Sequence, residues 1–175
     1  MPKSFVGGKA EAVEYIVKHY PGNSNVLDVG PGNGTYGKLL QDYEYHIEAV
    51  EQYEPYIEEF DLLKWYYQVH VADMVTFNYL PGRFDLVIFG DVIEHVGVEQ
   101  AQQMLRNVEE SGADILVSVP FLWPKATKGI IGDSHVQADL TQKVFMERYP
   151  GFEPIYIYRH INCVEKYGYF IYRQR

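Results

Sequence analysis

The segment Val26-Leu27-Asp28-Val29-Gly30-Pro31-Gly32-Asn33-Gly34 decides the fold, because a short apolar run with one carboxylate passes directly into three alternating glycines. The apolar residues predict a buried strand. Glycine at Gly30, Gly32 and Gly34 lets the backbone take a positive φ and approach a ligand closely. Asp28 would repel the pyrophosphate of a dinucleotide, so the turn favours a ligand with a cationic head group.

The run LDVGPGNG over residues 27–34 resembles the first motif of the class I S-adenosylmethionine-dependent methyltransferases, in which an acid, one residue and three alternating glycines follow one another. The resemblance extends over residues 26–172. It implies S-adenosylmethionine as cofactor and S-adenosylhomocysteine as product, and the ammonium and sulfonium of this cofactor suit Asp28. Two alternatives stay open: Gly32, Gly34 and Gly37 also fit the dinucleotide pattern G-x-G-x-x-G, and the turn could bind no ligand.

Helical and strand-like segments alternate along the chain, which predicts an α/β fold with a mainly parallel sheet. Helices are expected over residues 8–20, 35–42, 55–64, 98–111 and 140–148, and strands over 25–29, 45–50, 67–71, 84–89, 114–119, 153–159 and 164–172. We expect a single domain, with an N-terminal helix and lead-in over 1–24 and a Rossmann-like core over 25–175. The resemblance implies one doubly wound, seven-stranded sheet with an antiparallel last strand and helices on both faces.

Composition restricts the classes of partner. The chain has 175 residues and a formal net charge of −9, which is unsuited to nucleic acid or to an anionic membrane surface. The single cysteine, Cys163, excludes an internal disulfide or a thiolate metal cluster, and we expect it to fill apolar space among strand residues. Without a signal-like N-terminus or a long apolar segment, the expectation is a soluble cytoplasmic protein. The oligomeric state is not predicted.

Candidate cofactor contacts follow the second and third predicted strands. Glu51 lies 21 residues after Gly30, where a carboxylate accepts hydrogen bonds from a ribose in doubly wound sheets. Its alternative role is a solvated cap of the next helix. Asp73 resembles the family's acidic contact to adenine, with Met74 beside it as an apolar wall for the ring. The alternative for Asp73 is an Asx cap of the following turn.

Candidate acceptor residues follow the fourth predicted strand, in the segment Asp91-Val92-Ile93-Glu94-His95. If this segment turns helically, residues 91, 94 and 95 share one face. His135 lies in a long loop expected over residues 121–138, at the sheet edge where such folds keep their sites. We expect Asp91 near the cofactor and Glu94, His95 and His135 as the catalytic group, with a neutral imidazole taking a proton from the acceptor. The alternative for His95 is a packed structural histidine.

The resemblance implies a second interpretation of this cluster. In some family members a similar acid-x-x-Glu-His motif with a distant histidine holds a divalent metal ion that activates the accepting oxygen. Here Asp91 stands at the first position and has a shorter reach, so the primary expectation is a site without metal. DNA amino-methyltransferases carry Asn/Asp-Pro-Pro-aromatic after the fourth strand, and this chain has Gly90-Asp91-Val92-Ile93 there. Base methylation is therefore not supported.

The sequence predicts an enzyme that transfers the methyl group of S-adenosylmethionine to an oxygen or nitrogen atom of a small molecule or, alternatively, a protein. Much of the catalysis would come from aligning acceptor and methyl group. Two other functions stay open. A nicotinamide-dependent oxidoreductase is opposed by Asp28 and by the lack of a Tyr-x-x-x-Lys pair after the fifth strand. A non-enzymatic cofactor-binding or interaction protein on the same fold is opposed by no residue.

Overall fold

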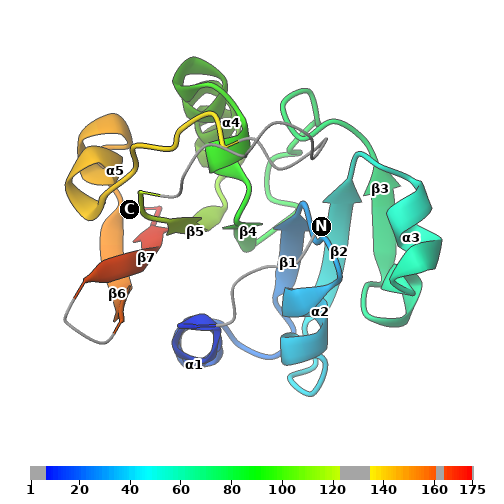
Figure 1. The fold of residues 1–175 in the computed structure, drawn as a ribbon. Coiled ribbons are helices and arrows are strands. Elements are labelled where there is room, and N and C mark those ends of the chain that lie inside the picture. Colours follow the sequence, from blue (N-terminus) through cyan, green and yellow to red (C-terminus); the bar gives the residue numbers. More distant parts are fainter. Residues whose placement is uncertain (1–6, 123–134, 161–163, 175) are drawn as a thin grey trace.

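The computed structural model describes residues 7–122, 135–160 and 164–174, which form a seven-stranded sheet with helices on both faces (Figure 1). The strand order is β3-β2-β1-β4-β5-β7-β6. The strands are β1 (Asn25–Val29), β2 (His46–Glu51), β3 (Gln68–Val71), β4 (Leu86–Gly90), β5 (Asp114–Pro120), β6 (Glu153–Arg159) and β7 (Glu165–Tyr172). Strands β1 to β5 are mutually parallel, and β7 is antiparallel to both of its neighbours. The expected doubly wound sheet with an antiparallel last strand is confirmed.

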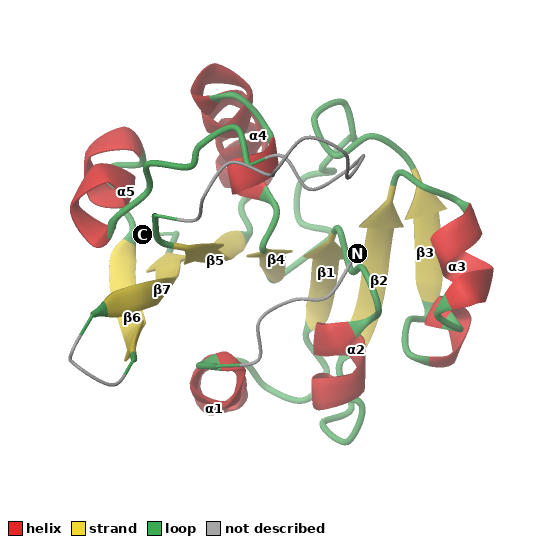
Figure 2. Cartoon of the chain, viewed as in Figure 1, coloured by secondary structure: helices red, strands yellow, loops and turns green. Residues whose placement is uncertain are grey.

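Helices cover both faces of this sheet. They are α1 (Lys9–His19), α2 (Thr35–Leu40), α3 (Pro55–Glu59), α4 (Val98–Ser111) and α5 (Gln142–Arg148), with 3₁₀ helices η1 (Leu62–Lys64) and η2 (Ile93–His95). Figure 2 shows α1 and α2 below the sheet, α4 and α5 above it, and α3 beside the edge strand β3. Two apolar cores separate the sheet from its helices, one around Ile16 and Tyr169 and the other around Met104 and Phe145.

Helix α4 shows how the sequence pattern produces an element. Its buried residues Ala101, Met104, Leu105 and Val108 recur at helical spacing and face the core. Its end is set by Gly112, whose φ of 87° is a left-handed conformation that favours glycine. The predicted bounds of this helix are therefore the observed ones.

Two predicted helices differ from the structure. The helix expected over residues 55–64 is interrupted, because Asp61 has a φ of 50° and cannot continue the turns of α3. The helix expected over residues 140–148 begins later, since Thr141 is its N-cap and its side chain accepts a hydrogen bond of 3.1 Å from the Val144 amide. Cys163 and most of the loop expected over residues 121–138 lie outside the described residues.

The strand order predicts where a ligand would bind. Starting from β1, the chain first adds β2 and β3 on one side and later adds β4 and β5 on the other, so the order reverses between β1 and β4. In open α/β sheets, ligands bind beyond the carboxyl ends of the strands at such a reversal. Within the described residues, no helix is long and apolar enough to cross a lipid bilayer.

Candidate active site

The glycine turn lies at the carboxyl end of β1 and leads into α2. Gly30, Gly32 and Gly34 have φ angles of 67°, 52° and 78°, so all three adopt the left-handed conformation. A Cβ atom at Gly30 would lie 2.8 Å from Cγ2 of Val92, which closes the room for any side chain there. The prediction that this turn depends on glycine for its conformation is confirmed at these three positions.

Asp28 lies in β1, two residues before this turn, and is 2 % exposed. Its Oδ2 atom accepts a hydrogen bond of 2.6 Å from the Tyr66 hydroxyl, and that hydroxyl accepts one of 3.1 Å from the Gly37 amide. Burial raises the pKa of Asp28 to about 7, although the Tyr66 hydrogen bond and the charge of Lys9 act in the opposite direction. Asp28 is therefore a carboxyl group whose charge responds to its immediate surroundings near neutral pH.

Lys9 supplies a buried positive charge on the same face of the sheet. It lies in the first turn of α1 and is 2 % exposed. Its Nζ atom lies 3.6 Å from Oδ2 of Asp91, donates a hydrogen bond of 3.3 Å to Oγ of Ser118 and sits 4.6 Å from the ring centre of Tyr36. Lys9 was not among the residues predicted from the sequence. Its spacing from Ala12 would have revealed it, since residue 9 belongs to the apolar face of α1.

Asp91 corrects the expectation of a single helical face. Its φ is 64°, a left-handed conformation that is strained in a residue other than glycine, and η2 begins only at Ile93. The carboxylate reaches Lys9, and Oδ1 also accepts a hydrogen bond of 3.4 Å from the Ser118 hydroxyl. Asp91 therefore lies on the Lys9 side, and it is not one of the three residues whose side chains converge beyond η2.

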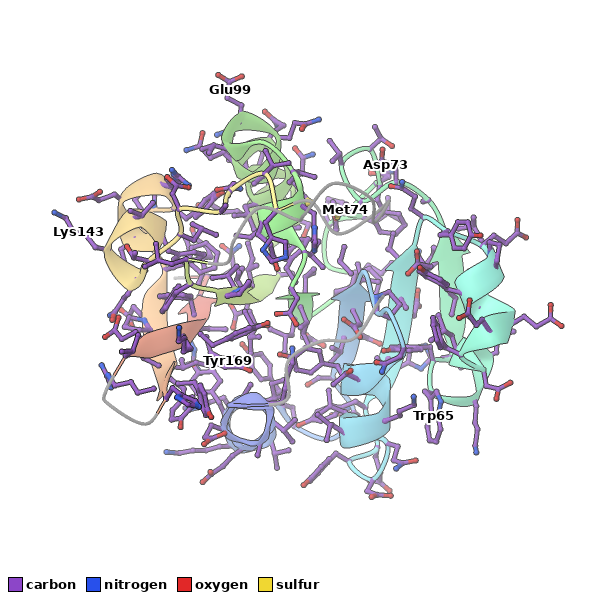
Figure 3. The ribbon with its side chains drawn as sticks, in the orientation of Figure 1. Trp65, Asp73, Met74, Glu99, Lys143 and Tyr169 are labelled. Atoms are coloured by element: carbon purple, nitrogen blue, oxygen red, sulfur yellow. The ribbon has the colours of Figure 1, made fainter. Side chains whose placement is uncertain are left out.

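Glu51 ends β2 as expected and is 8 % exposed. Its Oε1 atom accepts a hydrogen bond of 2.7 Å from the Tyr53 amide, and burial raises its pKa. Asp73 and Met74 lie beyond the carboxyl end of β3, at the upper side of Figure 3. Asp73 is exposed, and its Oδ1 atom accepts a hydrogen bond of 2.8 Å from the Val75 amide, which is the Asx cap considered as its alternative role.

Glu94, His95 and His135 come together beyond β4. One ligand-type atom from each side chain can be chosen so that all three atoms lie within 4.8 Å of one another. The two imidazole rings meet edge to face, with centres 4.8 Å apart and an interplanar angle of 86°. Both histidines are half-buried, whereas Glu94 is 1 % exposed. The sequence analysis grouped these three residues, and the structure brings them together although 40 residues separate His95 from His135.

The chemistry of this cluster depends on Glu94. Neither of its carboxylate oxygens has a hydrogen-bond partner within the described ranges, and Oε1 lies 4.0 Å from Nε2 of His95. Burial, and next the charge of Asp91, hold the pKa of Glu94 well above its usual range. A buried carboxyl group beside two imidazoles can hold or pass on a proton. One carboxylate and two imidazoles are also a donor set that binds divalent transition metals, so these residues fit a metal ion.

Comparison with known proteins adds a family and a set of structures. Residues 26–111 match the family model described as a methyltransferase domain. The 1,6-didemethyltoxoflavin-N1-methyltransferase of Burkholderia thailandensis, crystallised with 1,6-didemethyltoxoflavin and S-adenosylhomocysteine, is 16 % identical, with a TM-score of 0.69 over 95 % of this chain and 76 % of that chain. This chain has the class I methyltransferase fold.

Two further structures share this fold. The PH0226 protein from Pyrococcus horikoshii is 18 % identical, with a TM-score of 0.68 over 96 % of this chain and 90 % of that one. The N-methyltransferase NodS from Bradyrhizobium japonicum is 12 % identical, with a TM-score of 0.64 over 95 % and 96 % of the two chains. No curated protein matches the sequence. The match of residues 26–111 to a methyltransferase domain, together with the shared fold, confirms the predicted resemblance to the class I S-adenosylmethionine-dependent methyltransferases.

In this methyltransferase fold the candidate residues form two groups. One group surrounds the carboxyl ends of β1 and β2 and contains the glycine turn, Asp28 and Glu51. The other lies beyond β4 and contains Glu94, His95 and His135. Asp91 and its partner Lys9 lie between the two groups, because Asp91 directly follows β4 and contributes to the charge around both Asp28 and Glu94.

Proposed function

We propose that this protein transfers the methyl group of S-adenosylmethionine to an oxygen or nitrogen atom of a small-molecule acceptor. The observation that carries the proposal is the turn Gly30-Pro31-Gly32-Asn33-Gly34, with its three left-handed glycines, directly after the strand β1 that contains the buried carboxyl of Asp28. This arrangement suits a cationic cofactor and opposes a pyrophosphate. The match of residues 26–111 to a methyltransferase-domain family supports the same activity. Among the structures with this fold, the Burkholderia enzyme contains S-adenosylhomocysteine and a small-molecule ligand.

The cofactor would lie across the carboxyl ends of β1, β2 and β4. Glu51, the last residue of β2, would accept hydrogen bonds from the ribose hydroxyls. Met74 would face the adenine ring, and Asp73 would accept from its exocyclic amine once it gives up its cap to Val75. Asp28 and Asp91 would supply negative charge to the ammonium and sulfonium end of the cofactor.

The acceptor would lie beside Glu94, His95 and His135. Once bound, S-adenosylmethionine would supply a methyl group on a positive sulfur. The acceptor oxygen or nitrogen would form a bond to the methyl carbon as the carbon–sulfur bond breaks, which would leave the neutral thioether S-adenosylhomocysteine and release one proton from the acceptor. A neutral imidazole of His95 or His135 would take this proton. The buried carboxyl group of Glu94 lies beside both rings.

Methyl transfer can be tested before the acceptor is known. The protein is incubated with S-adenosylmethionine that carries a radioactive methyl group and with a cell extract that contains both small molecules and proteins, and label is then sought in the small-molecule and protein fractions. We expect label in the small-molecule fraction. His95→Gln or His135→Gln should lower transfer by about 10²–10⁴ if that ring is the base, without weakening cofactor binding. His19→Gln, an exposed change on α1, is the matched control.

The outcomes separate the competing functions. Label in the protein fraction alone would assign a protein acceptor. Cofactor binding without transfer to any fraction would favour a non-enzymatic cofactor-binding protein. If His95→Gln and His135→Gln both transfer at the normal rate, the proposed acceptor side is wrong.

The convergence of Glu94, His95 and His135 favours one variant of this function, in which a divalent metal ion takes part. Such an ion would polarise the accepting oxygen. Metal analysis of the purified protein and of the His135→Gln variant distinguishes metal-dependent from metal-free methyl transfer. Stoichiometric metal that is lost in the variant, with activity removed by chelator and restored by added ion, would replace the metal-free proposal.

A further inference from the structure

Residues 135–137 are fixed to η2 by backbone hydrogen bonds. The amides of Val136 and Gln137 both donate to the carbonyl oxygen of Glu94, at 2.8 and 3.1 Å. These two bonds join residues 136 and 137 to Glu94, the central residue of η2. The position of His135 over His95 therefore depends on how firmly residues 136 and 137 are held.

The side chain of Gln137 strengthens this connection. It is 4 % exposed, and its Nε2 donates to the carbonyl oxygens of Ile93 at 2.9 Å and Val96 at 3.1 Å. Its Oε1 accepts from the Tyr149 hydroxyl at 2.8 Å and from Nη1 of Arg148 at 3.3 Å. Both donor positions and both acceptor positions of the amide are thus used. The partners also fix its orientation, because carbonyls can only accept and the Arg148 guanidinium can only donate.

This amide joins three parts of the chain. Its donors hold the two ends of η2, its acceptor side holds the end of α5, and its own backbone follows His135 by two residues. A buried amide with all its hydrogen bonds made is rigid. Losing it would remove this donor from the carbonyl of Val96 and would leave the carbonyl of Ile93 only the 3.4 Å bond from the Val96 amide. We infer that Gln137 is a positioning residue that sets the place of His135 against His95, and so assembles the acceptor side of the site.

This inference rests on the proposed function for its meaning, but its test does not. The test uses the full chain without cofactor, labelled at histidine and at backbone amides, and measures two nuclear magnetic resonance signals. One is the nuclear Overhauser effect between the rings of His95 and His135, whose centres are 4.8 Å apart. The other is the hydrogen-exchange rate of the amides of residues 136 and 137. A failure to bind S-adenosylmethionine would alter neither measurement.

We expect Gln137→Leu to lose the signal between the two rings and to speed exchange at residues 136 and 137 by about tenfold or more, because the two amide donor bonds are gone. Gln102→Leu is the matched control. The Gln102 side chain donates a hydrogen bond of 2.9 Å to the carbonyl of Arg148, so it also touches the end of α5. This control should keep the ring signal and the slow exchange.

A second variant keeps the inference testable if Gln137→Leu does not fold. In Gln137→Glu the charged carboxylate still accepts from Tyr149 and Arg148 but cannot donate to the carbonyls of Ile93 and Val96. The ring signal should therefore be lost near neutral pH, where the carboxylate is charged. A folded Leu or Glu variant that keeps the ring signal and the slow exchange near neutral pH would overturn the inference.

Discussion

At the scale of single residues, Asp28 is the side chain that most clearly distinguishes this glycine turn from one built for a pyrophosphate. It is buried beneath the turn, and its pKa is raised to about 7 by that burial. In the folded protein it therefore keeps its proton well above the pH at which the unfolded chain releases it. The group costs stability when charged, and this is expected for a side chain retained for binding.

The first prediction concerns stability against pH. Because the pKa of Asp28 is higher in the folded state, its contribution to stability is complete below about pH 4 and is lost as the pH rises to about 7. The total loss is on the order of 2–4 kcal/mol. Asp28→Asn should remove this slope and be the more stable protein above pH 7, since an amide still accepts from Tyr66.

Chemical unfolding between pH 4 and pH 8 measures the effect. Glu94 adds a slope of the same sign, because its pKa is also raised by burial, so the quantity to compare is the difference between variant and wild type. Glu14→Gln, an exposed change on α1, is the control and should keep the slope. Parallel profiles for wild type and Asp28→Asn would mean that Asp28 is not buried as described.

The residues predicted from the sequence are those that belong to a short sequence motif. The glycine turn, Asp28 and the Glu94-His95 pair belong to compact motifs, and the glycine conformations and the meeting of His95 with His135 were found as expected. Lys9, Tyr66 and Gln137 were missed. Tyr66 lies 38 residues from Asp28, and Lys9 lies 109 residues from Ser118, so only the folded sheet brings these partners together.

At the scale of elements, α2 is a short helix whose packing requires a residue without a side chain. Gly37 lies within it, and a Cβ atom there would approach Cζ of Tyr66 to 2.7 Å and Cβ of Trp65 to 3.0 Å. The close contact allows the Tyr66 hydroxyl to lie between the Gly37 amide and Asp28. Helix α2 and the segment after η1 are therefore joined through this one position.

The second prediction follows from that contact. In most helices Gly→Ala stabilises by about 1 kcal/mol, but Gly37→Ala should destabilise the protein by about 1–3 kcal/mol because the added methyl group must displace Tyr66. Thermal unfolding measures the change. Gly97→Ala is the control, since its φ is −63° and its Cβ would meet only Oε1 of Gln100 at 3.5 Å. A stabilised Gly37→Ala protein would contradict the described packing.

Elements with strong periodic patterns were predicted better than elements set by one residue. The bounds of β1, α4 and β6 match the expected ones. The expected helix over residues 55–64 and the expected helical face from Asp91 to His95 were wrong. In both cases a single residue, Asp61 or Asp91, has a positive φ, and sequence periodicity does not reveal the φ of an aspartate.

At the scale of the whole molecule, the sheet separates two groups of candidate residues. The side of β1 and β2 carries the glycine turn and Glu51, and the side of β4 carries the Glu94, His95 and His135 cluster. The strand order could be expected from the resemblance, since alternating helices and strands alone allow several orders. The net charge of −9 agrees with a cationic cofactor more than with a polyanionic partner.

The most direct test of this account is calorimetric titration of the protein with S-adenosylmethionine, S-adenosylhomocysteine and NAD. We predict dissociation constants in the micromolar range for the first two and little affinity for NAD. Glu51→Ala should weaken binding of S-adenosylmethionine by about 1–3 kcal/mol, while Glu54→Ala, an exposed neighbour, should not. Binding of NAD tighter than binding of S-adenosylmethionine, or equal binding of S-adenosylmethionine by the Glu51 variant and wild type, would contradict the proposed cofactor site.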